Sequence, residues 1–253
     1  MPEVRSPREL QLGLRTLRRG DRGMRILVCG QRGSGKTTLG RALANHTGAN
    51  HFDGDEVRQA AGDWDFSDEG RLRQAKRMRE LCGNAPGLNV ASFICPTPET
   101  REAFSPHLTV WMDTRLRDNT VVPPTDCYTV GSFNDNHVQR IVERIPQAVM
   151  IGRFQPWHDG HMGLFLEALK AYGYVNIQVR RMPMGPDNPY SHYAARERIQ
   201  RALIGFEGCY RITSAPNVTA IVYGRDVGYD VRQIHLDPKL EAISATNIRN
   251  GSN

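Results

Sequence analysis

Eight residues near the start of the chain have the types and the spacing that hold the phosphates of a nucleotide. The segment is "GQRGSGKT" at positions 30–37, and it fits the pattern GxxxxGK[ST]. Its glycines let backbone N–H groups close around an anion, and a helix that follows presents its positive end to that anion. Lys36 would reach the β- and γ-phosphates, and the Thr37 hydroxyl would ligate Mg²⁺. We therefore predict that Lys36 is catalytic and that an ATP·Mg²⁺ site is formed by Gly30, Gly33, Ser34, Gly35, Lys36, Thr37 and Thr38.

A second set of residues suited to phosphate chemistry begins at position 152, in "GRFQPWHDGHMG". His158 and His161 flank Gly160 in an HxGH pattern, and "ISATNIR" follows at 243–249 in an ISxTxxR pattern. In nucleotidyl transfer, attack on the α-phosphate expels pyrophosphate and builds charge on the phosphate oxygens. The two imidazoles can donate N–H groups to those oxygens, and Gly160 allows close backbone approach at a helix start. Ser244 and Thr246 can donate from a second helix N-terminus, and Arg249 can bind the β- and γ-phosphates.

Apolar runs of strand length alternate with helical patterns along the chain, which predicts parallel sheets. In the first half we predict strands at 24–30, 88–94 and 108–113 and a helix at 36–48. The pattern weakens from Arg115 to Pro146, where we predict a lid and a linker. It resumes with strands at 147–154, 174–180 and 218–224 and with helices at 161–173 and 193–205. These elements predict a basic N-terminal extension at 1–23, a first domain at 24–145 and a second domain at 146–253.

The first half resembles adenylylsulfate kinase, one of the small-molecule kinases of the P-loop class, over about residues 24–114. The resemblance includes "HFDGDEVR" at 51–58, "FSDEGR" at 66–71 and "FICP" at 93–96. It implies that Asp53 is a catalytic residue and a Mg²⁺ ligand, because a carboxylate there can orient the acceptor hydroxyl and accept its proton. It also implies an acceptor site made of Asp55, Arg58, Phe66, Arg71 and Arg101.

This resemblance has limits and competing interpretations. The family has an asparagine where this chain has Gln74, and "RLRDNTVVPPTDCYTV" at 115–130 replaces the family's segment that closes over substrate. Asp53 and Asp55 are also consistent with an acidic turn at a strand end. For Arg73, Arg77 and Arg79 the simpler interpretation is the solvated face of a helix.

The second half resembles the nucleotidyltransferase superfamily that includes the nicotinamide-mononucleotide adenylyltransferases, through both HxGH and ISxTxxR. The resemblance implies catalytic roles for His158, His161 and Arg249. It implies a nucleotide site lined by Gly152, Arg153, Phe154, Gln155, His158, Gly160, His161, Ser244, Thr246 and Arg249. The predicted fold class is therefore α/β with two Rossmann-like parallel-sheet domains, a P-loop kinase domain followed by an HxGH nucleotidyltransferase domain.

Composition sets the broad class of protein. Five cysteines without a CxxC pair predict free thiols in a reducing compartment, and no apolar stretch reaches the length needed to cross a bilayer, so we expect a cytoplasmic protein without a membrane partner. The net charge of +6 fits a nucleic-acid partner, but arginines that bind phosphorylated small molecules explain it equally. We therefore do not expect nucleic acid as the partner, and a homo-oligomer is compatible with the sequence.

The two motifs together predict a bifunctional transferase. A kinase would use ATP and Mg²⁺ to phosphorylate a small hydroxyl acceptor, and a nucleotidyltransferase would then act on a phosphomonoester and release pyrophosphate. Two alternatives remain open. In the first, only the nucleotidyltransferase half is active, because the segment after Asp113 is altered. In the second, the chain is a nucleotide-sensing regulator or RNA-binding protein without turnover.

Overall fold

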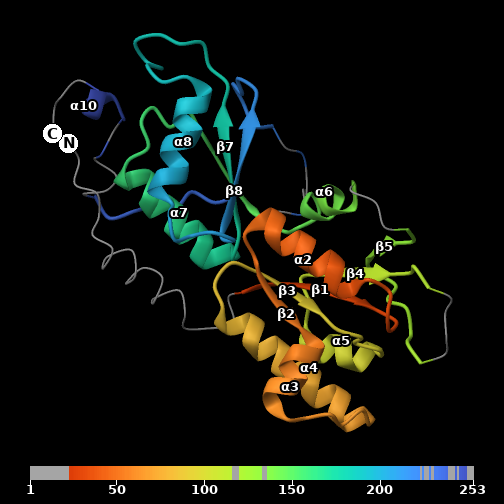
Figure 1. The fold of residues 1–253 in the computed structure, drawn as a ribbon. Coiled ribbons are helices and arrows are strands. Elements are labelled where there is room, and N and C mark those ends of the chain that lie inside the picture. The colour runs from red at the N-terminus through yellow and green to blue at the C-terminus, as the bar shows by residue number, and fades with distance from the viewer. Residues whose placement is uncertain are drawn as a thin grey trace. The chain divides into compact units, whose positions relative to one another are not determined.

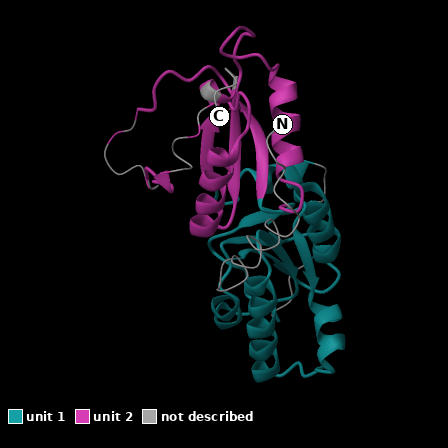
Figure 2. Ribbon diagram, turned by 90° about the vertical axis from the view of Figure 1, so that its left-hand side faces the viewer, with its two compact units in different colours: residues 1–147, 207–209 teal, residues 148–206, 210–253 magenta. Residues whose placement is uncertain are grey.

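The computed structural model describes residues 23–115, 120–132, 136–222, 224, 228, 231–238, 243 and 245–249. The chain divides into two compact units (Figure 2). Unit 1 is Met1–Gln147 with Glu207–Cys209, and unit 2 is Ala148–Phe206 with Tyr210–Asn253. Within the described ranges, no helix is both long enough and apolar enough to span a bilayer.

Unit 1 is built on a five-stranded parallel sheet in the order β2-β3-β1-β4-β5 (Figure 1). The strands are β1 (Met24–Gly30), β2 (Asn50–Asp53), β3 (Leu88–Ser92), β4 (Leu108–Met112) and β5 (Tyr128–Val130). The central strand β1 is buried along its whole length, which explains its continuous apolar sequence. In the Rossmann order β2 would lie next to β1, whereas here β3 does. Unit 1 is therefore a parallel α/β unit, but its strand order differs from the Rossmann-like order that we predicted.

Among the described residues, five helices accompany this sheet: α2 (Lys36–Thr47), α3 (Gly54–Ala61), α4 (Asp68–Asn84), α5 (Pro98–Phe104) and α6 (Asn136–Val142). The helix α2 ends at Gly48, which has the left-handed conformation that favours glycine. The side chains of Asp53, Ser67 and Thr97 cap the N-termini of α3, α4 and α5. One core cluster joins the sheet to α4 and α5 through Leu27, Met78, Phe93, Phe104 and Trp111.

Unit 2 contains a three-stranded parallel sheet in the order β6-β7-β8. Its strands are β6 (Ala148–Gly152), β7 (Val175–Arg180) and β8 (Tyr210–Ala215), and its helices are α7 (Asp159–Tyr172), α8 (His192–Ala202) and α10 (Ala245–Arg249). The strands end together: Gly152 pairs with Val179, and Arg180 pairs with Ala215. This common carboxyl edge is where open α/β sheets bind ligands.

Most predicted elements are confirmed, but the strand predicted at 218–224 is wrong in the described residues. The N–H of Val218 donates to the Pro216 carbonyl at 2.8 Å, which makes a turn. Ile221 and Val222 are 66% and 89% exposed, so their apolar side chains do not pack against a sheet. The helices α3, α5 and α6 and the strands β5 and β8 were not predicted. All of them are short or contain polar residues that obscure the periodic spacing of apolar residues.

Candidate functional site

The phosphate loop, residues 30–37, is a compact turn between β1 and α2. Gly30 has φ 145°, and a Cβ there would come within 2.7 Å of the Met112 carbonyl oxygen. The N–H of Ser34 donates to the Gln31 carbonyl at 3.2 Å and closes the turn. Because α2 begins at Lys36, the unpaired N–H groups of its first turn lie at this loop. The loop therefore has the backbone form of an anion site.

Lys36 and Ser34 place polar groups at the same loop. The Lys36 ammonium donates to the Gln31 carbonyl at 2.6 Å. Burial lowers the pKa of Lys36, and the carboxylate of Asp55 opposes this shift. The Ser34 hydroxyl oxygen is buried and has no hydrogen-bond partner among the described residues. A phosphate bound in the loop would supply such a partner, so these residues fit a nucleotide.

Thr37 meets Asp53 beside the loop. The Thr37 hydroxyl donates to Asp53 Oδ2 at 2.6 Å, while Asp53 Oδ1 accepts the N–H groups of Asp55 and Glu56 at 2.9 and 3.4 Å. One carboxylate oxygen therefore caps α3 and the other lies against the first turn of α2. Hydroxyl and carboxylate oxygens are ligands that Mg²⁺ prefers, so the pair fits this ion. The contact supports a role beyond an acidic turn.

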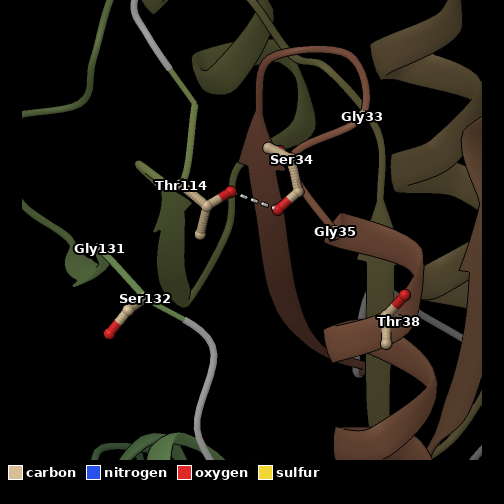
Figure 3. Close-up of a pocket in the computed structure, with 7 residues that line it drawn as sticks. All are labelled: Gly33, Ser34, Gly35, Thr38, Thr114, Gly131 and Ser132. Atoms are coloured by element: carbon tan, nitrogen blue, oxygen red, sulfur yellow. Dashed lines mark hydrogen bonds between the residues drawn. The ribbon is translucent and has the colours of Figure 1, made fainter.

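The opposite wall of the loop comes from the segments after β4 and β5. The Thr114 hydroxyl donates to the Ser34 carbonyl at 2.7 Å, and the Arg115 Nε donates to the Gly33 carbonyl at 3.1 Å. A hollow of about 430 Å³, a volume typical of small-ligand sites, lies here (Figure 3). It is lined by Gly33, Ser34, Gly35, Thr38, Thr114, Gly131 and Ser132. The last three of these were not predicted.

The wall at Ser132 is fixed by a buried histidine of α6. His137 Nε2 lies 2.7 Å from the Ser132 carbonyl oxygen, and its Nδ1 lies 2.8 Å from the Tyr128 hydroxyl. Both ring nitrogens are therefore hydrogen-bonded, and they connect α6 to Tyr128 of β5 and to Ser132. These described residues of the segment that we predicted as lid and linker thus support the wall of the phosphate site.

Arg58 and Phe66, two predicted acceptor residues, contact each other. The Arg58 guanidinium lies 4.8 Å from the centroid of the Phe66 ring, and it donates to the carbonyls of Asp63 and Asp65 at 3.0 and 2.9 Å. Arg58 is buried, whereas Phe66 is 54% exposed beside the equally exposed Trp64. The structure therefore presents an aromatic surface to solvent and uses Arg58 to hold the loop beneath it.

A network of arginines from α4 holds this loop. Arg73 donates to both Asp63 carboxylate oxygens at 2.8 and 3.0 Å, and Arg77 donates to Asp63 at 2.8 Å. These hydrogen bonds hold the pKa of Asp63 well below its usual range. Gln74, the departure from the family, is buried and donates to the Gly54 carbonyl at 3.1 Å. Arg73 is exposed, as a solvated helix face requires, although it also pairs with Asp63, whereas the Arg77 side chain is only 25% exposed and lies against Asp63.

The other predicted acceptor residues differ in their availability. The Arg101 guanidinium already donates to the carbonyls of Cys95 and Val122 at 3.2 and 2.9 Å. In the part of the chain that the structure describes, the half-buried Arg71 side chain has no hydrogen-bond or ion-pair partner, and Asp55 is exposed. Arg71 is therefore free to bind an anion, whereas Arg101 has a local structural use.

In unit 2 the two histidines of the HxGH pattern lie together at the start of α7. Their rings stack with centroids 3.7 Å apart. The N–H of His158 donates to His161 Nδ1 at 3.3 Å, which leaves the proton of a neutral His161 on Nε2. Burial, reinforced by the nearby His158, lowers the pKa of His161 to about 3, and burial also lowers the pKa of His158. Both imidazoles are therefore neutral N–H donors at pH 7.

The residues before the histidines hold the backbone in an unusual path. Phe154 has φ 51°, and its ring lies 2.8 Å from where a Cβ at position 152 would stand, so any larger residue at Gly152 would displace the ring. The Phe154 ring packs edge-on against His161 at 5.0 Å. Gln155 is buried and exchanges two hydrogen bonds of 2.9 Å with the backbone of Tyr190. Phe154 and Gln155 thus position the site, whereas Arg153 is exposed.

The second motif of unit 2 is described only in part. A helix covers Ala245–Arg249, as expected for a helix that begins within ISxTxxR, and Thr246 is exposed on it. Ser244 and the side chain of Arg249 lie outside the described residues. Gly160 is buried in the first turn of α7.

A comparison with known families finds a match within unit 1. Residues 22–120 match the family model of adenylylsulphate kinase. The N-terminal unit contains an adenylylsulphate kinase-like P-loop kinase domain. The match covers β1 to β4 with their helices and ends before β5. None of the curated proteins matches the chain.

Solved structures give weaker likenesses. An adenylylsulfate kinase from Mycobacterium tuberculosis is 20% identical over 48% of this chain and 96% of that one, with a TM-score of 0.40. A hexameric adenylylsulfate kinase from Thiobacillus denitrificans is 24% identical over 49% of this chain and 29% of that one, with a TM-score of 0.38. A shikimate kinase from Acinetobacter baumannii in complex with shikimate is 19% identical over 49% and 94%, with a TM-score of 0.36. All three TM-scores are below 0.5, so the class of unit 1 depends on the family match.

Proposed function

We propose that unit 1 transfers the γ-phosphoryl group of ATP to a hydroxyl group of a small molecule. The observation that supports this proposal best is the 2.6 Å contact between Thr37 and Asp53, next to a phosphate loop in a P-loop kinase domain. Thr37 and Asp53 would hold Mg²⁺, which when bound neutralises charge on the β- and γ-phosphates. Lys36 would turn from the Gln31 carbonyl to the same phosphates, and its ammonium would stabilise the charge of the transferring group.

The acceptor would lie over the aromatic surface at Phe66. Its hydroxyl would face Asp53, whose carboxylate orients it and takes its proton as the new O–P bond forms and the γ-phosphate leaves ADP. Asp55 and Arg101 would border this site. The exposed Phe66 ring just before α4 and the free Arg71 guanidinium in the first turn of α4 favour a flat acceptor with a negative charge. Adenylylsulfate has this chemistry, but so do other hydroxylated anions.

We propose a second activity for unit 2, the transfer of a nucleotidyl group to a phosphomonoester. The observation that favours it is the stacked pair of neutral imidazoles at the start of α7, with the proton of His161 on Nε2. A phosphate oxygen of the acceptor attacks the α-phosphorus, the bond to the bridging oxygen breaks, and pyrophosphate leaves. His158 and His161 would donate to the oxygens that gain charge. Arg153, Ser244, Thr246 and Arg249 would hold the triphosphate.

The two activities are chemically consecutive. A kinase creates a phosphomonoester, and a nucleotidyltransferase consumes one. Incubation with ATP, Mg²⁺ and a panel of hydroxylated metabolites tests both, with ADP and pyrophosphate measured separately. We expect Lys36→Ala to abolish ADP release but to spare nucleotidylation of a supplied phosphomonoester, and His161→Ala to do the reverse. Tight ATP binding without either product, or a strongly salt-dependent affinity for RNA, would favour a sensor or RNA-binding protein instead.

A further inference from the structure

His51 of β2 and Ser92 of β3 connect the sheet of unit 1 to the start of α2. His51 Nε2 lies 3.0 Å from Ser92 Oγ, and the Ser92 hydroxyl donates to the Lys36 carbonyl at 3.2 Å. Ser92 is buried and His51 is half-buried, so these contacts lie beneath the surface of the domain. We call the chain of hydrogen bonds from His51 through Ser92 to the Lys36 carbonyl the His51 relay.

The direction of each hydrogen bond in the His51 relay is fixed. A carbonyl oxygen only accepts, so Ser92 gives its single O–H proton to Lys36 and accepts a hydrogen bond from His51 Nε2. Burial lowers the pKa of His51, although the Asp53 carboxylate opposes this shift, so the ring is neutral at pH 7 with its proton on Nε2. A residue at position 51 therefore completes the relay only if it donates from the place of Nε2, as a glutamine amide does and leucine does not.

The strand register places the His51 relay beside the proposed metal pair. Ser92 pairs with Asp53 of β2, and His51 lies two residues before Asp53 on the same strand. Paired residues, and residues two apart in a strand, point to the same face of a sheet, so His51, Asp53 and Ser92 share one face. The first turn of α2 is attached to this face at two points, by Thr37 to Asp53 and by the Lys36 carbonyl to Ser92.

Gly40 of α2 makes this attachment possible. A Cβ at Gly40 would overlap Ser92 Oγ and lie 2.7 Å from His51 Nε2. Because Gly40 has no side chain, the helix lies close enough to the sheet for Ser92 to reach the Lys36 carbonyl. The surface between a helix and a parallel sheet is normally filled by apolar side chains, and a buried polar group there costs free energy unless it is hydrogen-bonded. A bonded polar pair at this point therefore indicates a role beyond packing.

We propose that His51 and Ser92 are positioning residues for phosphoryl transfer in unit 1. The proposal rests on the kinase activity proposed above, and it gives these two residues no contact with ATP or with the acceptor. Ser92 holds the backbone carbonyl of Lys36, and the backbone in turn fixes the point from which the Lys36 ammonium reaches the phosphates. The relay thus keeps Lys36 and Thr37 in place relative to Asp53. Phosphoryl transfer depends chiefly on such positioning, so a small displacement of α2 has a large effect.

Calorimetric titration of the full chain with ATP and Mg²⁺ tests the proposal without knowledge of the acceptor. Lys36→Ala identifies the part of the ATP binding that belongs to unit 1. The relay variants are Ser92→Ala, His51→Leu, His51→Gln and the double variant Ser92→Ala/His51→Leu. Ser92→Ala removes one oxygen atom and keeps the fold even if His51→Leu does not. The matched control is Asn50→Ala, because Asn50 of β2 also donates to a side chain of β3, that of Asn89 at 3.0 Å, but makes no hydrogen bond to α2 among the described residues.

We expect Ser92→Ala and His51→Leu each to weaken the Lys36-dependent ATP affinity about tenfold. His51→Gln should bind ATP nearly as wild type does, because its amide still donates to Ser92. The double variant should bind no more weakly than either single variant, because each substitution already breaks the same relay. Asn50→Ala should lower the urea midpoint and leave the ATP affinity unchanged.

Wild-type ATP affinity in both Ser92→Ala and His51→Leu would overturn the proposal. So would a loss in His51→Gln as large as that in His51→Leu, because the relay needs only a donor at this place. An equal loss in Asn50→Ala, or losses that add in the double variant, would instead assign the effect to a general loosening of the sheet and also reject the relay. If Lys36→Ala itself binds ATP as wild type does, the proposed kinase function fails together with the relay, so the Lys36→Ala titration distinguishes the two failures.

Discussion

Substitution of Asp53 separates structural from chemical roles, because its two carboxylate oxygens do different things. Oδ1 caps α3 through the N–H groups of Asp55 and Glu56, and Oδ2 accepts the Thr37 hydroxyl. Asp53→Asn keeps an oxygen for the cap and removes the charge, and Asp53→Ala removes both. The two variants should therefore differ in stability and agree in lost activity.

The expected magnitudes follow from these contacts. Asparagine caps helices about as well as aspartate, so Asp53→Asn should lower the free energy of unfolding by less than about 1 kcal/mol. Asp53→Ala loses the cap, which costs about 1–2 kcal/mol. Both variants lose the group that takes the hydroxyl proton, so the rate of ADP formation should fall about 10²–10⁴-fold. Both should also lose the part of the ATP affinity that depends on Mg²⁺.

Two measurements check this prediction, and one of them needs no acceptor. Calorimetry of ATP binding with Mg²⁺ and with EDTA should show a large Mg²⁺ effect in wild type and little in either variant. Urea unfolding should rank wild type and Asp53→Asn close together and Asp53→Ala below them. If Asp53→Asn keeps the full Mg²⁺ effect on ATP affinity, Asp53 is a helix cap at an acidic turn and the proposed mechanism is wrong.

Three further predictions concern the residues that support the two sites. The pKa of His161 is about 3 in the folded chain and about 6.5 when unfolded, so the unfolded state binds more protons between these pH values. The free energy of unfolding should therefore fall as the pH drops from 6.5 toward 3, by up to about 1.4 kcal/mol per pH unit. The difference between the urea midpoints of wild type and His161→Gln should change between pH 7.5 and 4.5, and an unchanged difference would contradict the burial of His161. Gln155→Ala leaves the N–H and C=O of Tyr190 without their partner, and it should cost about 2–3 kcal/mol in unfolding experiments, whereas a change below about 0.5 kcal/mol would show that water replaces the amide. Arg73→Ala frees the loop around Asp63 and should raise KM for the kinase acceptor several-fold at nearly constant KM for ATP; equal rises in both constants would indicate general disruption.

The phosphate loop was predictable from sequence because its constraints are local. Gly30 and Gly35 have positive φ, and Gly48 ends α2 in the left-handed conformation, so each glycine stands where the backbone requires it. The strand β1 and the helix α2 begin and end within one residue of the predicted bounds. The pairing of His158 with His161 is equally local, since residues three apart lie on one face of a helix.

The contacts that sequence reasoning missed join residues far apart in the chain. Thr114 and Ser132 reach the phosphate loop because β4 pairs with β1 in the sheet and β5 pairs with β4. Arg73 and Arg77 point at Asp63 because the loop before α4 folds back onto it. The run of charge on α4 alone does not distinguish such a network from a solvated face. The prediction of a strand at 218–224 was wrong for a related reason. An apolar run forms a strand only where it can pair with a neighbouring strand, and the sequence of the run does not show whether such a strand is present.

The two proposed activities would handle phosphate charge in different ways. In unit 1 a cationic lysine lies in the phosphate loop, and the oxygen pair of Thr37 and Asp53 is suited to a metal ion. In unit 2 the histidines are neutral at pH 7, so they contribute hydrogen bonds without net charge. If unit 2 has the proposed activity, the positive charge for a triphosphate and a second phosphate would come from arginines outside the histidine pair. The net charge of +6 is thus consistent with a chain that binds phosphorylated small molecules, as both proposals require.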